Sequence, residues 1–339
     1  MTTPALSSKP TGWFQIGWST DLEVGQVRPM RYFGTDLVAW RDSDGTAHVM
    51  DAYCRHLGAH LGYGGCVVDG GLQCPFHGWV WDPDGHNVSI PYQDRPSKAL
   101  MRVWHVHEWN GVLAIWHDRD GRPPYFAPHQ SFADIAPHLS RLEFHQPGPD
   151  AQSRFTNSRV HPQMIIENAV DPAHFAFVHH TPSIPGVLQE DVTEHTWHSK
   201  VGFGGRWKDG VDRPEDDMGT LHLSFHGLGM GYNALTDPER VMMVLIAATP
   251  VDDGTSEVFG TYWPQVLPDD DRTEGHLKRI ALAKEALPED LVIWEHQLFR
   301  AAPALATSEG AGWARMREWC EQFYPDGELG PLRLRAATT

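Results

Sequence analysis

The 339-residue chain contains only four cysteines, and Cys66 and Cys320 lie far apart, so no disulfide framework is indicated. It has no apolar run of 18 residues, and its first twelve residues lack the basic and apolar regions of a signal peptide. Lys and Arg number 27 against 44 Asp and Glu, a formal charge of -17, which argues against nucleic acid or an anionic membrane as a partner. We therefore expect a soluble, cytoplasmic protein.

A nucleotide-binding fingerprint and internal repeats are also missing. The glycine-rich segments 202–205 and 227–231 lack the strand–Gly-x-Gly-x-x-Gly–helix context that nicotinamide and flavin nucleotides require. We therefore expect any electrons from NADH to arrive through a separate protein.

Two short segments combine cysteine with histidine in the spacing C-x-H-x17-C-x2-H. Two thiolates and two imidazoles are the ligands of a Rieske 2Fe-2S cluster, in which the cysteines bind one iron and the histidines the other. A Cys2His2 zinc site uses the same donors and is the alternative. The mixed pairs and the glycine- and histidine-rich loops around them favour the cluster. Its predicted ligands are Cys54, His56, Cys74 and His77.

Short apolar runs dominate from Trp13 to about Trp116, separated by turn sequences such as Asp42-Ser43-Asp44-Gly45 and Asp82-Pro83-Asp84-Gly85. Asp and Gly favour turns because Asp caps the backbone and Gly adopts positive φ. This pattern predicts a small all-β domain with the metal loops at one end. Prolines interrupt every apolar period in residues 117–152, where we expect the domain junction.

The segment 161–180 has helical periodicity that Pro172 interrupts. We expect a helix to restart there, with Asp171 as its N-cap. His174 and His179 are five residues apart, about 140° on an ideal helix, so both can bind one ion only if the helix ends or widens between them. An electron-relaying cluster needs an electron acceptor. A mononuclear iron held by two imidazoles and a carboxylate is the simplest one.

The remaining sequence alternates between the two kinds of secondary structure. Apolar runs predict strands near 201–203, 221–225, 241–246 and 257–263, and helices are expected over 274–284, 290–300 and 313–324. The charged segment 208–217 is expected to be an exposed loop, and residues 325–339 a tail.

These motifs together resemble the Rieske non-heme iron oxygenases, because the cluster motif is followed by Asn168-x2-Asp171-x2-His174-x4-His179. Segments 167–175 and 318–324 are more narrowly similar to the oxygenase component of 3-ketosteroid 9α-hydroxylase. The resemblance implies an α+β fold. An N-terminal all-β Rieske domain (1–125) would precede a helix-grip catalytic domain (126–339), a curved antiparallel sheet around a long helix.

The resemblance also implies roles for individual residues. His174, His179 and Asp290 match the ligands of the mononuclear Fe(II), although the residues alone leave Glu289 and Glu295 as alternatives to Asp290. Asp171 matches the family's bridging acid, which joins an iron histidine of one subunit to a cluster histidine of the next; an N-cap role is the alternative. Asn168, one turn earlier, lies near the iron in the family and could equally be an ordinary helix side chain.

The implied activity is that of the terminal oxygenase component of a monooxygenase. It would use O2 and electrons from an NADH-dependent flavin/iron-sulfur reductase or ferredoxin to hydroxylate a bulky apolar substrate, a 3-ketosteroid or related polycycle. The bridging acid implies a homotrimer. Alternatives are an aromatic demethylase or ring-hydroxylating dioxygenase acting on a smaller aromatic, and an electron-transfer or iron-sensing protein. The expected apolar pocket includes Phe175, Phe177, Met230 and Met242.

Overall fold

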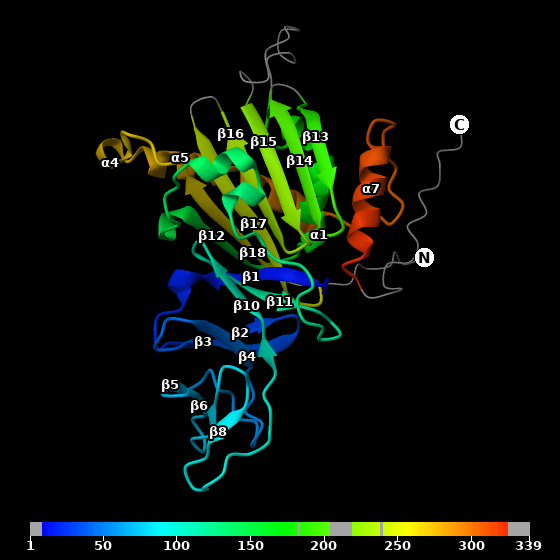
Figure 1. Ribbon diagram of the computed structural model, residues 1–339. Coiled ribbons are helices and arrows are strands. Elements are labelled where there is room, and N and C mark those ends of the chain that lie inside the picture. Colours follow the sequence, from blue (N-terminus) through cyan, green and yellow to red (C-terminus); the bar gives the residue numbers. More distant parts are fainter. Residues whose placement is uncertain (1–8, 182–183, 204–218, 238–239, 325–339) are drawn as a thin grey trace.

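A computed structural model describes residues 9–181, 184–203, 219–237 and 240–324 of the chain. Figure 1 shows three tiers: small strands with the cysteine-containing loops at the bottom, two further sheets in the middle, and a large sheet with its helices at the top. The expected loop at 208–217 and the expected tail at 325–339 lie outside the described residues. The predicted α+β fold, with an all-β N-terminal part, is confirmed.

The N-terminal part is built from three small antiparallel sheets, ordered β1-β11-β10, β2-β3-β4-β9 and β5-β6-β7-β8. Their strands are β1 (Gly12–Trp18), β2 (Val27–Tyr32), β3 (Thr35–Arg41), β4 (Ala47–Asp51), β5 (Cys66–Val68), β6 (Gly71–Gln73), β7 (Val80–Trp81), β8 (Asn87–Ser89), β9 (Val103–Trp104), β10 (Val106–Trp109) and β11 (Val112–His117). A 3-10 turn, η1 (Ser19–Asp21), follows β1.

Both predicted turns form, and for the expected reason. The Asp42 carboxylate accepts hydrogen bonds from the backbone N–H groups of residues 44 and 46, and Gly45 has φ +85°. Asp82 and Gly85 repeat the arrangement in the second turn. Because each turn joins two adjacent strands, it sets their register.

The large sheet is antiparallel, with the order β12-β18-β17-β16-β15-β14-β13. Its strands are β12 (Gln152–Ser158), β13 (Gly186–Val192), β14 (Thr196–Phe203), β15 (Gly219–His226), β16 (Met230–Thr236), β17 (Val241–Asp252) and β18 (Thr255–Pro264). Alternation along β17 separates the two faces. Met243, Leu245 and Ala247 pack towards the N-terminal strands, whereas Met242 and Ala248 face the helices.

Short helices connect and cover this sheet. They are η2 (Phe132–Asp134), η3 (Pro137–Arg141), η4 (Pro149–Ala151), α1 (Pro162–Glu167), η5 (Asn168–Val170), α2 (His174–Phe177), α4 (Asp270–Thr273), α5 (Gly275–Ala283), α6 (Ala286–His296) and α7 (Gly310–Glu321). None of the helices in the described ranges is long and apolar enough to cross a membrane.

Two sequence-based expectations about helix ends are wrong. Asp171 is not an N-cap, because α2 begins at His174 with Ala173 as its N-cap, and Asp171 instead ends η5. The Asp171 carbonyl is engaged by the His174 ring nitrogen, which fixes the backbone between them. The helix expected over 290–300 runs instead from Ala286 to His296, because Pro288 fits in its first turn, where backbone N–H groups have no partner inside the helix.

The N-terminal part and the large sheet share one hydrophobic core rather than meeting at a wet interface. Trp13, Trp18 and Trp116 pack with Phe259 and Trp263 of β18. The Trp18 indole N–H also donates to Thr261 Oγ1 at 2.8 Å. Because each buried aromatic side chain contributes roughly 1.5–3 kcal/mol relative to exposure, this junction holds the two parts in a fixed orientation.

Stability in acid should depend on His117 at the end of β11. Its ring is 5% exposed and stacks on Phe33, and its Nδ1–H donates to the Pro10 carbonyl at 2.9 Å. Burial lowers its pKa from 6.5 to about 4, so the folded state favours the neutral ring. Its stabilising contribution is complete above the unfolded pKa of about 6.5 and is lost as the pH falls towards 4, about 2 kcal/mol between pH 7 and pH 5.

We therefore expect the thermal midpoint of the native protein to fall between pH 7 and pH 5 by several degrees more than that of His117→Gln. Glutamine keeps a donor but does not titrate. Equal losses in both proteins would show that His117 is not responsible.

Candidate functional site

Two loops of matching backbone geometry, one before β5 and one after β6, carry the four predicted cluster residues, and both strands lie in the bottom tier of Figure 1. In the first, Cys54 N–H donates to the Ala59 carbonyl and Gly58 N–H to the Cys54 carbonyl, both at 2.9 Å. In the second, Cys74 pairs in the same way with Trp79 and Gly78. Gly58 and Gly78 have φ of +75° and +70°, which glycine adopts without strain. The loops thus bring both cysteines and both histidines to one end of the domain.

The cysteines are buried and the histidines lie towards the surface. Cys54 and Cys74 are 2% and 3% exposed, and the Trp81 indole N–H donates to Cys54 Sγ at 3.3 Å. Burial raises the pKa of the Cys54 thiol, while the donors from Trp81 and the His56 backbone lower it by favouring the thiolate. The rings of His56 and His77 lie 4.8 Å apart. His77 Nδ1 is buried without a hydrogen-bond partner, as a metal-binding nitrogen requires.

The arrangement does not suit one zinc ion. A tetrahedral zinc site draws its four donor atoms to within about 4 Å of one another. Three groups of at least three donors within 4.8 Å of one another exist among the described residues, and none includes the four cluster residues. Cysteines on one side and histidines on the other instead fit a two-iron cluster with a different ligand pair on each iron.

The second predicted site is brought together from three segments. His174 lies at the start of α2, His179 follows the end of that helix, and Asp290 lies on α6. Their ligand atoms are within 4.8 Å of one another, and His179 Nε2 lies 3.4 Å from Asp290 Oδ2. Adjacent ligands of one ion are typically about 3 Å apart, so this group fits a metal with little rearrangement. The predicted end of the helix between the two histidines is observed, because α2 stops at Phe177.

Asp290 reaches this group because it lies on the buried face of α6. Leu287, Asp290, Leu291 and Trp294 recur at helical spacing and are the buried residues of the helix. Glu295 is not among the grouped donors, and Glu289 contacts the other nitrogen of His179. Of the three acids that the sequence left open, the geometry therefore places Asp290 alone beside both histidines.

Neighbouring groups orient the two rings. His174 Nδ1 lies against the Asp171 carbonyl, and His179 Nδ1 is 2.9 Å from Glu289 Oε2. Burial lowers the pKa of His174, against the charge of Asp290. Burial also lowers the pKa of His179, but the hydrogen bonds and charges of Asp290 and Glu289 outweigh it and raise the pKa overall. The sequence did not reveal the role of Glu289, because the contact spans 110 residues.

A cavity of about 470 Å³ extends from these residues between the sheet and helices α5 and α6. Apolar side chains form most of its wall, including Leu223, Phe225, Val244, Ile246 and Leu287. Asn168 and Asn233 supply polar groups. A volume in this range suits an organic molecule of drug-like size.

The sequence-based list of pocket residues was half right. Phe175 and Met242 line the cavity. Phe177 is 77% exposed, because α2 turns it outward, and Met230 packs in the core on the opposite face of the sheet. The strand that contains Met242 was predicted and β16, which contains Met230, was not; alternation alone also does not tell which face of a sheet carries the cavity.

Family comparisons agree with this geometry. Residues 12–110 match the Rieske [2Fe-2S] domain, and residues 115–324 match the 3-Ketosteroid 9alpha-hydroxylase C-terminal domain. Cholesterol 7-desaturase nvd of Hemicentrotus pulcherrimus is 28% identical over 94% of this chain and 70% of its own length. The oxygenase component of 3-ketosteroid-9-alpha-monooxygenase from Rhodococcus rhodochrous is 28% identical, over 94% and 80%.

Solved structures share the fold at lower identity. Dicamba monooxygenase bound to dicamba is 18% identical, with a TM-score of 0.66 over 94% of this chain and 98% of that one. Pseudomonas putida CBB5 NdmA QL mutant with theobromine is 20% identical, with a TM-score of 0.65 over 91% and 89%.

The two matching domains, in this order, cover most of the chain, and each contains the residues of one of the two candidate centres. The protein is an oxidoreductase whose cofactors are a Rieske 2Fe-2S cluster and a mononuclear iron, and it requires a reductase or ferredoxin as electron donor. As the motifs indicated, the chain is a Rieske oxygenase and belongs to the family of the 3-ketosteroid 9alpha-hydroxylase C-terminal domain.

Proposed function

We propose that this protein is the terminal oxygenase component of a monooxygenase that hydroxylates a 3-ketosteroid or related polycycle. The supporting observation is the apolar cavity of about 470 Å³ that opens onto His174, His179 and Asp290. Its few polar groups suit a bulky apolar molecule with isolated oxygen substituents. Two relatives with sterol or steroid names, each covering 94% of the chain, support this substrate class.

The proposed division of roles follows the geometry. Cys54, His56, Cys74 and His77 hold the cluster, and His174, His179 and Asp290 hold the iron. When bound, the iron would supply a binding position for O2 and the cluster would supply electrons. The Asp171 carbonyl and Glu289 fix the two iron histidines in orientation, and the apolar wall excludes water from the bound substrate. Asn168 lines the cavity beside the iron ligands, where its amide can orient substrate.

A homotrimer is proposed because the two centres of one chain are far from each other. The cluster loops adjoin β5 and β6, in the bottom tier of Figure 1, and the middle sheets separate this tier from the large sheet, whose residues line the cavity. A cluster in one subunit would therefore serve the iron of the next, with Asp171 at the contact. Such head-to-tail contacts close into a ring. The external electron donor is proposed to be an NADH-dependent flavin/iron-sulfur reductase or a ferredoxin.

We also propose the domain junction at residues 125 and 126. This point falls in the proline-rich connection between the end of β11 at His117 and the start of η2 at Phe132. Residues 1–125 would then form the Rieske domain and residues 126–339 the catalytic domain.

The activity is tested by supplying a reductase and NADH and measuring O2 consumption across a panel of steroids and smaller aromatics, with product identification. A polycycle that gains one hydroxyl and couples NADH to O2 supports the proposal. Formaldehyde from a methoxylated aromatic, or a cis-diol, would instead establish the demethylase or dioxygenase alternative. Uncoupled NADH use with every compound would count against all of these substrates.

Glu289 should contribute to iron retention through its contact with His179. A carboxylate that accepts the second N–H of a metal-binding imidazole orients the ring, and losing it typically costs about 10- to 100-fold in metal affinity or activity. We expect Glu289→Ala to lose iron to a chelator at correspondingly lower concentration, with Glu289→Gln less affected. The cluster absorption should not change. Glu295→Ala, an acid on the same helix outside the site, is the matched control, and equal iron retention in both alanine variants would refute this role.

A further inference from the structure

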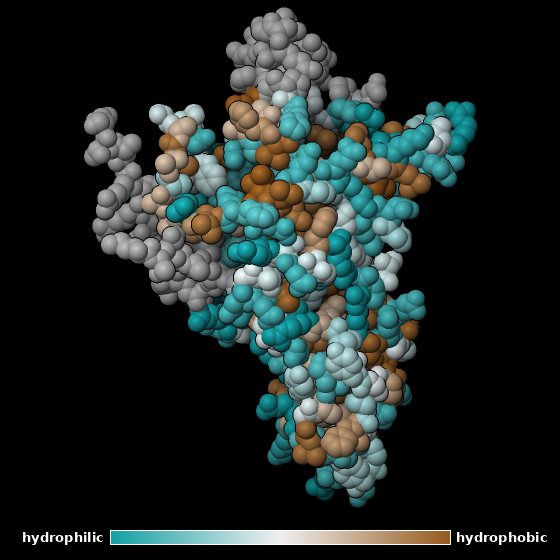
Figure 2. Space-filling view, turned by 180° about the vertical axis from the view of Figure 1, so that it is seen from behind, coloured by the Kyte–Doolittle hydropathy of each residue, from teal (hydrophilic) through white to brown (hydrophobic). Residues whose placement is uncertain are grey.

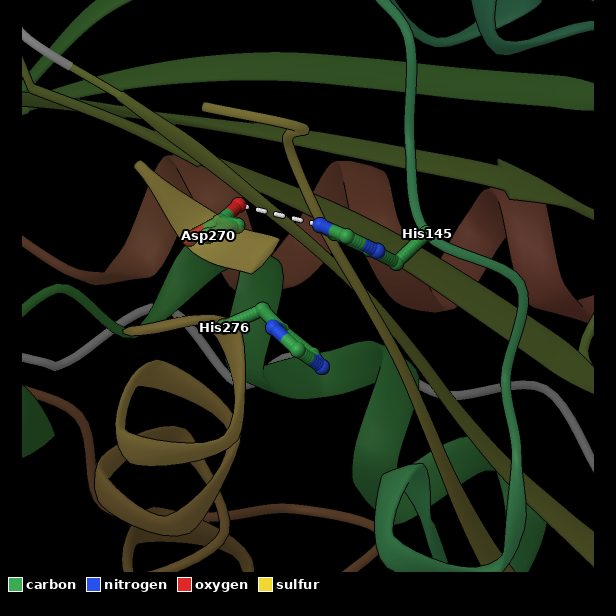
Figure 3. Close-up of side chains that lie close together, drawn as sticks. All are labelled: His145, Asp270 and His276. Atoms are coloured by element: carbon green, nitrogen blue, oxygen red, sulfur yellow. Dashed lines mark hydrogen bonds and ion pairs between the residues drawn. The ribbon is translucent and has the colours of Figure 1, made fainter. Parts of the chain in front are cut away.

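A second group of two histidines and one aspartate lies outside the site described above. Figure 3 shows His145 on the connection that precedes η4, with Asp270 and His276 on the α4–α5 segment. The three ligand atoms lie within 4.8 Å of one another. His145 Nε2 is 2.9 Å from Asp270 Oδ2, and the two imidazole rings stack with centroids 4.4 Å apart. The group shares no residue with either iron centre.

One nitrogen of this group has no partner. His276 Nδ1 is buried and makes no hydrogen bond, although a buried polar atom is normally paired. Two imidazoles and one carboxylate are the donors that zinc and similar divalent ions prefer, and three protein ligands leave a fourth position for water. We infer that His145, Asp270 and His276 form a binding site for a divalent transition-metal ion of the zinc class.

Hydrogen bonds hold the Asp270 carboxylate in one orientation. Arg279 donates to both of its oxygens at 2.8 Å, and the Leu267 backbone N–H donates to Oδ2 at 2.8 Å. Ligating carboxylates are generally oriented by such hydrogen bonds. The Arg279 charge opposes a cation, but residues 269–274 carry four acids and only one arginine, which leaves the segment negative. The His145 side chain is 24% exposed, which gives an ion a route in from solvent.

An ion at this site would tie two distant parts of the chain together. His145 lies on the segment between η3 and η4, and its backbone N–H donates to the Pro264 carbonyl at the end of β18. His276 lies in the first turn of α5, and Arg279, Leu282 and Ala283 of the same helix line the substrate cavity. The ion would therefore connect helix α5, which forms part of the cavity wall, to the segment that is hydrogen-bonded to the end of β18. The imidazole rings of His145 and His276 are stacked, so a nitrogen of each can face one ion only after the rings rotate. Metal binding would therefore change the orientation of both histidine side chains.

The test uses the full-length protein with both iron centres loaded and zinc ion alone as the probe. Calorimetric titration should give one zinc per chain, with the iron content unchanged. His276→Asn should weaken zinc binding by at least about 100-fold. Replacing a residue that only hydrogen-bonds to a metal ligand already lowers metal affinity by about 10- to 100-fold. His105→Asn, an exposed histidine of the N-terminal part, is the matched control and should bind as the native protein does. Equal zinc affinity in His276→Asn and the native protein overturns the proposal.

A second measurement does not depend on whether the variant folds. X-ray absorption at the zinc edge of the native protein should show nitrogen and oxygen ligands at about 2.0–2.1 Å, with scattering from two imidazoles. One imidazole or none would mean scattered surface binding and would overturn the site. Loss of iron in step with zinc uptake would place the zinc at the mononuclear iron centre and would also overturn it.

Discussion

Replacing His174 with alanine is expected to abolish turnover while leaving the visible absorption of the cluster unchanged. The two centres use separate residues, and strands β5 and β6, next to the cluster loops, lie at the opposite end of the molecule from the large sheet that lines the cavity (Figure 1). Without His174, one imidazole and one carboxylate remain to hold the iron. The loss should exceed about 100-fold, because changes in the partners of metal ligands alone cost about 10- to 100-fold.

The measurement combines substrate-dependent O2 consumption, iron content and the absorption spectrum of the same sample. His180→Asn is the matched control, because it changes a neighbouring exposed histidine and asparagine tolerates the φ of +52° found there. Loss of the cluster spectrum in His174→Ala would contradict the assignment of separate centres. Normal turnover would exclude His174 as an iron ligand.

The chemistry of both centres could be predicted from the sequence because most of their predicted ligands lie in short segments. Each cluster loop carries one cysteine and one histidine within four residues, and a single turn fixes both. The spacing of His174 and His179 even required a helix end between them, and α2 ends there. Asp290 was harder to single out, because three acids stand close together on one helix and only tertiary packing selects among them.

Other features could not be predicted because they depend on which face of an element is covered. Met242 lies in a predicted strand, whereas Met230 lies in β16, which was not predicted; Met230 faces the core and Met242 faces the cavity. A shift of one residue in strand phase exchanges these outcomes. His145 and Asp270 are 125 residues apart, so their contact appears only after the sheet has formed. Figure 2 shows that apolar and polar residues are interspersed over the coloured part of one face of the molecule, so exposure too cannot be assigned by residue type alone.

Mixed oligomers of two inactive variants should recover activity if Asp171 acts between subunits. We expect Asp171→Asn alone to be inactive with both iron centres intact, because the amide cannot accept hydrogen bonds from two imidazoles as a carboxylate does. Cys74→Ser should lose the cluster and also be inactive, yet it keeps Asp171 and the iron ligands. In a mixed ring, a cluster in an Asp171→Asn subunit lies next to an intact Asp171 in a Cys74→Ser subunit, and that pair can turn over.

Co-expression with two different affinity tags isolates the mixed species, and turnover per ring is compared with that of each variant alone and of the native protein. Where the mixed species contains one subunit of one kind and two of the other, a single productive contact per ring predicts roughly a third of native activity. The informative control is a mixture of Cys74→Ser with a double variant that carries both Asp171→Asn and His174→Ala. The second change removes an iron ligand only from subunits whose iron should receive no electrons. That mixture should retain the recovered activity. No recovery in either mixture, with both metals present, would mean that electrons pass within one chain and that Asp171 does not bridge subunits.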